Sequence, residues 1–164
     1  MFAFPKPMNC SYPTKSVLVI EDNSNDVFLL RHALEKIDPT LDVLTLSSGE
    51  LALNYLLGQG EYRHQNRHPL PCLIFLDLHI PRTSGFEILQ RIKKEPGLKR
   101  TPVVITSGSR QPEDVDRAYD LGANLYLTKK DDFAAMSESV KSIVTLFLSD
   151  SAARRLPSSA ALTT

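Results

Sequence analysis

Cysteine is scarce in this sequence, with two residues, Cys10 and Cys72, in a chain of 164. Two cysteines are too few for a disulfide framework or for a four-cysteine metal site. We expect Cys10 to be an exposed thiol in an irregular segment and Cys72 to be a small, buried apolar residue that opens an apolar run. This sparing use of cysteine fits a reducing, cytoplasmic setting.

An excess of charge of either sign is also absent, because 19 lysines and arginines balance 19 aspartates and glutamates. Nucleic-acid-binding domains usually carry a basic balance or a basic patch, so we expect no nucleic-acid partner. No apolar stretch approaches the roughly 18 residues that span a bilayer. The N-terminal segment MFAFPKPMNCSYP lacks the apolar core of a secretory signal. The sequence therefore predicts no association with a membrane.

The length of the chain is that of one domain, since roughly 100–200 residues make up a typical one. Residues 1–14 are expected to form an irregular arm, because their prolines disfavour a helix. Residues 149–164 are rich in small side chains and are expected to form a flexible tail. The folded domain is therefore expected over residues 15–148.

Five short apolar runs alternate with five segments of helical periodicity. The predicted strands cover residues 17–20, 43–46, 73–76, 103–106 and 125–128. The predicted helices cover 26–36, 50–57, 86–94, a segment between Pro112 and Gly122, and 132–148. The strands are continuous apolar runs, as expected when both faces of a sheet are covered. The pattern predicts an α/β fold, a doubly wound, five-stranded parallel sheet with five helices.

Polar residues follow these apolar runs at four strand ends. They are Glu21 and Asp22 after the first strand, Asp77 after the third, Ser107 after the fourth and Lys129 after the fifth. Ligands of such sheets bind outside the carboxyl ends of the strands. Three carboxylates close together repel one another unless a cation intervenes, and oxygen ligands select a hard ion such as Mg²⁺. The set predicts a Mg²⁺ site in which a carboxylate acts as a nucleophile and forms an aspartyl phosphate.

Four motifs carry a resemblance to a known family. The segments VLVIEDN, LIFLDLHIPRTSGFEIL, TPVVITSGS and GANLYLTKK resemble those of response regulator receiver domains of two-component signalling, over residues 15–148. The resemblance implies a receiver, or flavodoxin-like, fold. It also implies a phosphoacceptor signalling protein rather than an enzyme, one that catalyses its own phosphotransfer and dephosphorylation.

The resemblance assigns roles to the residues at the strand ends. Asp77 corresponds to the phosphoacceptor, Asp22 to the direct Mg²⁺ ligand, and Glu21 to an acid that holds the ion mainly through water. The backbone carbonyl of His79 would complete the metal site. Lys129 corresponds to the lysine that pairs with the phosphoryl oxygens.

A second set of residues is implied in the response to phosphorylation. Ser107 corresponds to the switch hydroxyl that turns toward the phosphoryl group, and Tyr126 to the aromatic residue that moves inward on activation. His79 and Ser109 lie two residues after the phosphoacceptor and two after the switch hydroxyl. We expect these two side chains to tune the lifetime of the phosphoryl group.

A narrower resemblance concerns the partners. The loop LLGQGEYRHQNRHPLP and the DLHIPRTSG turn are similar to those of small regulators paired with phytochrome-type histidine kinases. The expected partner is therefore a sensor histidine kinase of that type. No DNA-binding domain is expected after residue 148, so the signal should leave by protein contact. Leu146 and Leu148 lie off the apolar stripe of the last helix and favour a homodimer through that helix and the fifth-strand face.

Three positions depart from the usual receiver pattern. One is Ser107, which replaces the commoner threonine, and the loss of a methyl should leave its hydrogen bond intact. Lys130 stands where most receivers have proline, which removes the usual reason for a cis peptide after Lys129, because non-proline cis bonds cost about 2.5–4 kcal/mol. Both geometries stay open from the sequence. Ser84-Gly85 replaces the commoner Asp-Gly, and we expect only a local change in that turn.

Other functions are weighed against this one. A hydrolase of the haloacid dehalogenase type needs a second aspartate two residues after the nucleophile, where this chain has His79. A nucleotide-binding module would carry a GxxxxGK[ST] or GxGxxG loop, and neither is present. A degenerate receiver that serves as a protein-interaction platform stays the alternative. His64 and His68 have the spacing of a metal pair, but without cysteine or carboxylate partners we expect a solvated loop.

Overall fold

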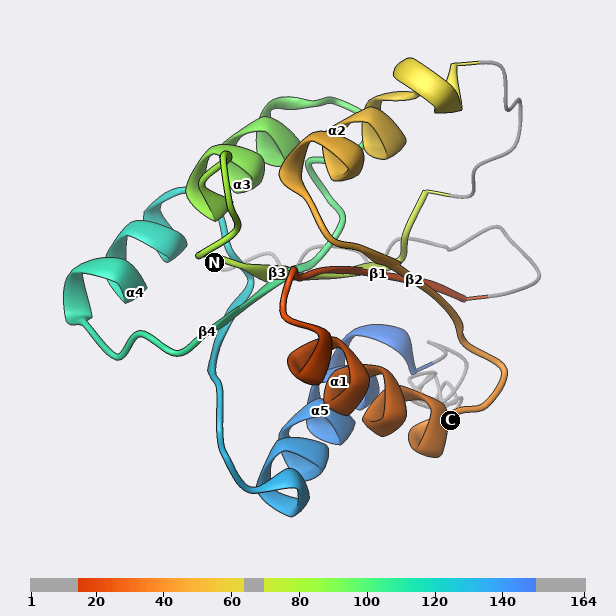
Figure 1. The fold of residues 1–164 in the computed structure, drawn as a ribbon, viewed down its shortest axis with the longest axis vertical. Coiled ribbons are helices and arrows are strands. Elements are labelled where there is room, and N and C mark those ends of the chain that lie inside the picture. Colours follow the sequence, from red (N-terminus) through yellow and green to blue (C-terminus); the bar gives the residue numbers. More distant parts are fainter. Residues whose placement is uncertain (1–14, 64–69, 150–164) are drawn as a thin grey trace, which may run out of the picture.

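Strands and helices alternate along the residues that the computed structural model describes, 15–63 and 70–149 (Figure 1). Within them, five parallel strands form one sheet in the order β2-β1-β3-β4-β5. The strands are β1 (Ser16–Ile20), β2 (Asp42–Leu46), β3 (Leu73–Asp77), β4 (Val103–Ser107) and β5 (Leu125–Thr128). The helices are α1 (Ser24–Ile37), α2 (Gly49–Leu57), α3 (Gly85–Lys94), α4 (Pro112–Asp120) and α5 (Phe133–Leu148), with a short 3-10 helix η1 (Gly60–Tyr62). The predicted doubly wound parallel sheet is confirmed.

The central strands present alternate residues to two hydrophobic clusters. Leu18 and Ile20 of β1 pack into the cluster that includes α2 and α3, whereas Val17 and Val19 pack into the cluster that includes α1 and α5. Figure 1 shows α2 and α3 on one side of the sheet and α1 and α5 on the other. Because successive side chains of a strand point to opposite faces, a strand covered on both sides must be apolar throughout.

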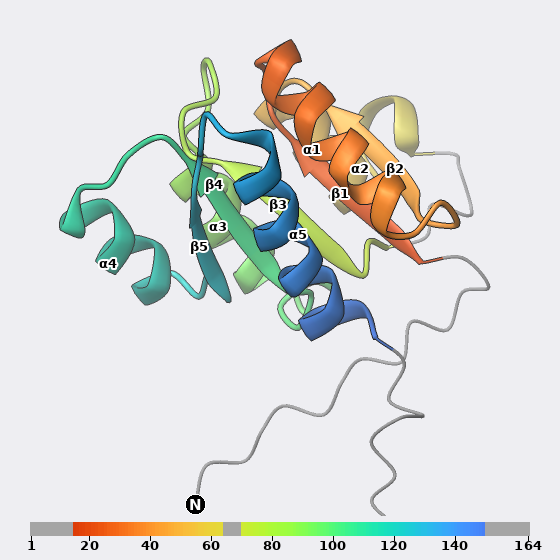
Figure 2. The ribbon, with the colours of Figure 1, turned by 90° about the horizontal axis from the view of Figure 1, so that it is seen from below.

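Helix α4 makes little apolar contact with this core. Ala118 is its buried residue, and Figure 2 shows the helix standing beside the β4–β5 part of the sheet. The guanidinium of Arg117 lies over the ring of Phe86, 4.2 Å from its centroid. The hydroxyl of Tyr119 accepts the backbone N–H of Tyr126 at 3.1 Å. Polar and cation–π contacts therefore supply much of the attachment of α4.

The helix ends follow local signals in the sequence. Helix α1 begins at Ser24, earlier than the predicted Asp26, because the side chain of Asn23 accepts backbone N–H groups of the first turn. Helix α2 begins after the Ser48 cap and ends at Gly58, which adopts the left-handed region with a φ of 61°. The other predicted bounds agree with the structure within about one residue.

Two expectations about single residues are wrong. Cys72 is disulfide-bonded, so no free thiol stands at this position; Cys10 lies outside the described residues. Leu148, expected to face a partner, is 7% exposed and belongs to the core. Lys15 holds that end of α5 to the start of β1, because its Nζ donates to the Leu148 carbonyl at 2.7 Å. Leu146, in contrast, is 56% exposed.

Some expectations fall on segments outside the described part of the chain. These are the arm at residues 1–14, the histidines His64 and His68, and the tail from residue 150. The beginning of the loop before β3 is described, and it forms η1 rather than irregular structure, with Tyr62 packed edge-on against Tyr55. Of the helices in residues 15–63 and 70–149, none is long and apolar enough to cross a bilayer.

Candidate functional site

The carboxyl ends of β1 and β3 bring three carboxylates together. Glu21 and Asp22 follow β1, Asp77 ends β3, and the two strands are neighbours in the sheet. One oxygen from each of the three side chains lies within 4.8 Å of the other two. Glu21 and Asp77 are buried, with 3% and 4% exposure, whereas Asp22 is exposed to solvent. The structure thus brings together the three acids that the sequence placed at one sheet edge.

Glu21 has a hydrogen-bond partner for each of its carboxylate oxygens. The backbone N–H of Asn23 donates to Oε1 at 3.0 Å, and the ammonium of Lys129 donates to Oε2 at 2.7 Å. Burial raises the pKa of the Glu21 carboxyl, and the nearby charge of Asp77 acts in the same direction. The bonds from Lys129 and Asn23 lower this pKa without cancelling the effect of burial.

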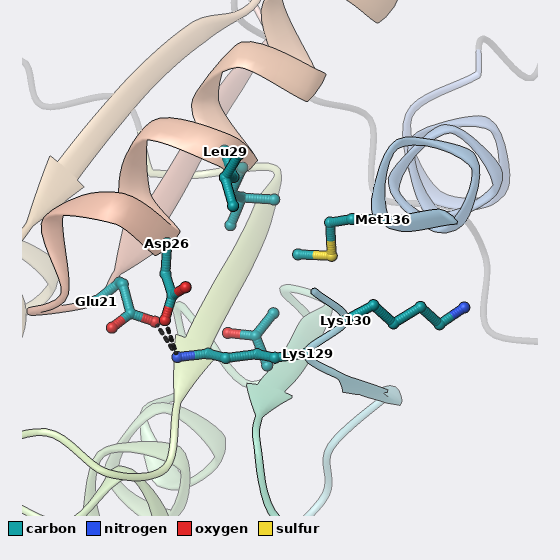
Figure 3. Close-up of a pocket in the computed structure, with 8 residues that line it drawn as sticks. Glu21, Asp26, Leu29, Lys129, Lys130 and Met136 are labelled. Carbon is teal, nitrogen blue, oxygen red and sulfur yellow. Dashed lines mark hydrogen bonds and ion pairs between the residues drawn. The ribbon is translucent and has the colours of Figure 1, made fainter. Parts of the chain in front are cut away.

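Lys129 places its ammonium at the centre of the acidic group. Its Nζ lies 2.7 Å from Glu21 Oε2 and 2.8 Å from Asp26 Oδ2 (Figure 3). The same Nζ lies 3.2 Å from Asp77 Oδ2. Burial alone would lower the pKa of the Lys129 amine. The bonds to Asp26 and Glu21, together with the charge of Asp77, outweigh burial and raise that pKa above its ordinary value.

Asp26 is a residue of this site that the sequence analysis missed. It lies in the first turn of α1, which follows directly on β1 and therefore stands over the end of that strand. Its position four residues after Asp22, inside the EDNSND segment, was the available signal. The spacing alone could not show that a lysine 103 residues later bonds to it.

The segment after Asp77 folds back closely onto the strand end. The N–H of Gly85 donates to the carbonyl of Leu78 at 3.0 Å. A Cβ atom at position 85 would overlap the carbonyl oxygen of Asp77 and lie 2.6 Å from the Cα of Leu78, so glycine is required by this approach. Ser84 and Glu87 form a capping box that starts α3 at this point. The turn therefore anchors α3 directly behind Asp77.

Ser109 connects the two predicted switch residues. Its N–H donates to the Oγ of the fully buried Ser107 at 3.1 Å, and its carbonyl accepts the hydroxyl of Tyr126 at 3.0 Å. Its own hydroxyl donates to the carboxylate of Asp114 on α4 at 2.5 Å. Tyr126 is partly buried against the cluster that includes α2 and α3. Movement at the end of β4 is therefore linked to β5 and α4 through one residue.

His79 and Lys130 border the site without joining the acidic group by their side chains. The backbone N–H of His79 donates to Asp77 Oδ1 at 3.2 Å, while the side chain is exposed. Lys130 extends toward α5, where its Nζ donates to the hydroxyl of Ser139 at 3.4 Å (Figure 3). The peptide bond between Lys129 and Lys130 is trans, which decides the geometry that the sequence left open.

The donor set of the acidic group fits a divalent metal ion. Glu21, Asp22 and Asp77 offer only oxygen ligands, which hard divalent cations prefer. Two of these acids are buried, and the single ammonium of Lys129 leaves the three negative charges, that of Asp22 included, only partly neutralised. The site is thus built to hold a divalent ion among its three carboxylates.

The family of the chain follows from its match to a family model. The model of the response regulator receiver domain matches residues 17–141. The chain belongs to this family. Receivers are the phosphoacceptor modules of two-component signalling, and this receiver has the acidic group, Lys129 and the Ser107 hydroxyl at the ends of adjacent strands.

Relatives of this receiver agree with that assignment. It is 36% identical to the response regulator Rcp1 of Synechocystis sp. over 138 residues, covering 84% of this chain and 92% of Rcp1. It is 34% identical over 128 residues to the probable methanogenesis regulatory protein FilR2 of Methanothrix harundinacea, covering 77% of this chain and 79% of FilR2.

Solved structures share the fold over most of the chain. The phosphorylated cyanobacterial phytochrome response regulator RcpA is 38% identical with a TM-score of 0.76, over 88% of this chain and 99% of RcpA. The Mn²⁺-bound form of Rcp1 is 36% identical with a TM-score of 0.74, over 82% of this chain and 94% of Rcp1. The narrower likeness to regulators of phytochrome systems is confirmed, and the receiver assignment replaces the dehalogenase-type and nucleotide-binding alternatives.

Proposed function

We propose that this receiver accepts a phosphoryl group on Asp77 from a sensor histidine kinase and signals through protein contacts. The observation that supports this most directly is the Lys129 ammonium, which lies 3.2 Å from Asp77 Oδ2 beside two further carboxylates. Asp77 is the one of the three acids that both ends a strand and is buried against the α3 turn. Its carboxylate is held in place for attack on phosphorus.

The proposed transfer is a displacement at phosphorus. An oxygen of Asp77 forms the new O–P bond as the N–P bond of the kinase phosphohistidine breaks, and the histidine nitrogen leaves with the bonding electrons. Charge on the transferred group is spread over three equatorial oxygens, so catalysis consists mostly of positioning and neutralisation. Lys129 is placed to neutralise one of these oxygens. Attack by water later releases inorganic phosphate and restores the Asp77 carboxylate.

Mg²⁺ is the divalent ion that we propose for the acidic group. Asp22 and Asp77 would bind it directly, Glu21 mainly through water, and the backbone carbonyl of His79 would complete the set. When bound, the ion supplies neutralising charge for the phosphoryl oxygens. The oxygen-only donor set supports a hard cation, and Mg²⁺ commonly takes one or two carboxylates and keeps several waters.

Ser107 and Tyr126 are the residues through which phosphorylation would alter the surface. A phosphoryl group adds about −1.5 to −2 charge and three acceptor oxygens, and the Ser107 hydroxyl would turn to donate to one of them. That movement would break the bond that Ser107 Oγ accepts from Ser109. Since Ser109 also accepts the Tyr126 hydroxyl, the shift would alter the packing of Tyr126 and α4. Phosphorylation would thereby bias an equilibrium between two arrangements of this face.

His79 and Ser109 are proposed to set the lifetime of the phosphoryl group. His79 follows Asp77 by two residues and its side chain is exposed, and Ser109 follows Ser107 by two residues and donates its hydroxyl to Asp114. Replacing His79 with alanine should change the rate at which the phosphorylated protein loses inorganic phosphate. An unchanged rate would remove His79 from this role, and Ser109→Ala tests its partner in the same assay.

A phytochrome-type histidine kinase is the proposed phosphoryl donor, on the strength of the likeness to RcpA. A homodimer through α5 and β5 is proposed because Leu146 is 56% exposed on α5. Leu146→Asp should shift the protein toward monomer in sedimentation experiments, whereas Leu70→Asp, at a residue 36% exposed outside α5, should not. A wild-type protein that sediments as a monomer with and without acetyl phosphate would contradict the dimer.

The proposed domain covers residues 15–148, with an arm before it and a tail after it. The proposed compartment is the cytoplasm, where histidine kinases phosphorylate their receivers. Thiol counting on protein lysed directly into an alkylating reagent would decide the state of the cysteines in the cell.

The test of this function is the intact mass after incubation with acetyl phosphate and Mg²⁺. We expect one phosphoryl adduct that requires Mg²⁺ and is absent in Asp77→Asn. If neither acetyl phosphate nor a phosphorylated histidine kinase yields the adduct, the chain is a degenerate receiver that serves as a protein-interaction platform. An adduct that persists in Asp77→Asn would place the phosphoacceptor elsewhere.

A further inference from the structure

Asp26 binds the site lysine from outside the group of potential metal ligands. Its Oδ2 lies 2.8 Å from Lys129 Nζ, yet the acids that converge on a common point are Glu21, Asp22 and Asp77. Asp26 comes from the first turn of α1, one element away from the strand ends. In Figure 3 it approaches the ammonium beside Glu21, from the α1 side.

The ammonium and a divalent ion compete for the same oxygens. Lys129 bonds to Glu21 at 2.7 Å and to Asp77 at 3.2 Å, and both acids belong to the potential ligand set. Two cations that share these carboxylates repel each other. When a divalent ion enters, Lys129 must therefore loosen its bonds to Glu21 and Asp77. Of the three acids bonded to Lys129, Asp26 is the one that lies outside the potential metal-ligand set.

The surroundings of Lys129 restrict where its ammonium can go. Its side chain lines a pocket with the apolar residues Leu29, Leu30 and Met136, with Thr106 and with the cationic Lys130, and the acids of this pocket are Glu21 and Asp26. Without Asp26, the acids left to the Lys129 ammonium would be the metal ligands Glu21 and Asp77, with solvent as the alternative. A lysine lost to solvent would have to be recaptured before it could meet a phosphoryl oxygen.

We propose that Asp26 is a positioning residue that holds the Lys129 ammonium at the α1 side of the site while a divalent ion occupies Glu21, Asp22 and Asp77. This inference rests on the proposed function of the site. Asp26 acts through Lys129 and touches neither the ion nor the reacting phosphorus. It reduces the competition between the two cations and keeps the ammonium beside Asp77 for the incoming phosphoryl group.

A double-mutant cycle on Mg²⁺ affinity tests this role. Isothermal titration calorimetry would compare the wild type, Asp26→Asn, Lys129→Met and the double variant, with circular dichroism to check folding. We expect Asp26→Asn to weaken Mg²⁺ binding about fivefold, because the ammonium then stays on Glu21 and Asp77. In the Lys129→Met background the same substitution should change the affinity less than twofold. Lys129→Met alone should tighten Mg²⁺ binding.

Two further variants separate position from charge. Asp26→Glu should restore most of the lost affinity, since it keeps a carboxylate in reach of Lys129. Asp131→Asn removes an exposed acid of the β5–α5 loop and should leave the affinity unchanged. Equal effects of Asp26→Asn in both Lys129 backgrounds, or no effect in either, would refute the role of Asp26. With normal Mg²⁺ binding and an Asp77 adduct in the wild type, that result would leave the proposed function intact; a wild type that binds no Mg²⁺ would refute both.

Discussion

The hydroxyl of Tyr126 donates to the backbone carbonyl of Ser109 at 3.0 Å and ties β5 to the loop between β4 and α4. Ser109 also bonds to the buried Ser107 and, through its hydroxyl, to Asp114 of α4. The end of β4, the edge strand β5 and the thinly packed α4 therefore meet at one residue. Hydrogen bonds of Ser109 thus connect the Ser107 hydroxyl to both Tyr126 and Asp114.

Tyr126→Phe should loosen the loop between β4 and α4 while leaving phosphorylation intact. The loss of one hydrogen bond costs about 1 kcal/mol of local stability, so amides of residues 108–111 should exchange several-fold faster, as measured by hydrogen exchange. Tyr119→Phe is the matched control, since it removes the acceptor of the Tyr126 N–H and spares the carbonyl of Ser109. Failure of Tyr126→Phe to form the Asp77 adduct would contradict a purely downstream role.

Gly85→Ala should distort the backbone at Asp77 and Leu78, next to the phosphoacceptor proposed above. An alanine Cβ would overlap the Asp77 carbonyl and crowd the Cα of Leu78, so backbone has to move. We expect a loss of about 3 kcal/mol in the free energy of unfolding, measured by urea denaturation, and slower formation of the phosphoryl adduct. Gly97→Ala is the control, because a Cβ at position 97 would contact nothing within 4 Å and the backbone there has no positive φ. Its free energy of unfolding should stay within about 1 kcal/mol of wild type. Equal stability of the two variants would contradict the close approach at position 85.

Lys93 should make stability rise with pH in the alkaline range. Burial lowers the pKa of its amine from the ordinary 10.5 to about 8. Between these two values the unfolded chain binds more protons than the folded chain, so the free energy of unfolding increases as the pH rises from about 8 to 10.5. The amine keeps its bonds to the Thr101 carbonyl and to Asn124 Oδ1, both at 2.9 Å, because a neutral amine still donates.

Urea denaturation of wild type and Lys93→Met across that pH range would check this. The wild type should gain stability relative to Lys93→Met as the pH rises from about 8, and the difference should be constant at lower pH. Lys94→Met, at the exposed neighbouring position, serves as the control. A constant difference between wild type and Lys93→Met over the whole range would contradict the lowered pKa.

Thr101→Val should be neutral or stabilising. Among the described residues, the Thr101 hydroxyl is the buried side-chain oxygen or nitrogen with no hydrogen-bond partner. Valine keeps the shape and removes the uncompensated polar group, so we expect the free energy of unfolding to rise by about 1 kcal/mol. Thr101→Ala separates the methyl from the hydroxyl and should be less stable than Thr101→Val. A clear loss of stability in Thr101→Val would mean that the hydroxyl has a partner in solution.

Local and periodic features of this protein could be predicted from its sequence. The continuous apolar strands require a sheet covered on both faces, and that places Glu21, Asp77 and Lys129 at one edge. The Ser48 cap and the left-handed Gly58 set the ends of α2 because such signals act over a few residues. Caps, turns and side-chain alternation depend on the backbone and its nearest neighbours, so they are readable before the chain is folded.

Long-range contacts were decided only by the tertiary structure. The bond of Lys129 to Asp26 joins residues 103 positions apart, and the burial of Leu148 depends on how α5 lies against the sheet. The chain around Lys129 and Lys130 adopts a trans peptide that sequence reasoning left open. Such contacts depend on packing angles between elements, and a shift of one helix by a few ångströms would exchange their partners. The sequence by itself therefore determined which residue types lie at the sheet edge. The packing of α1 decided that Asp26 bonds to Lys129 there.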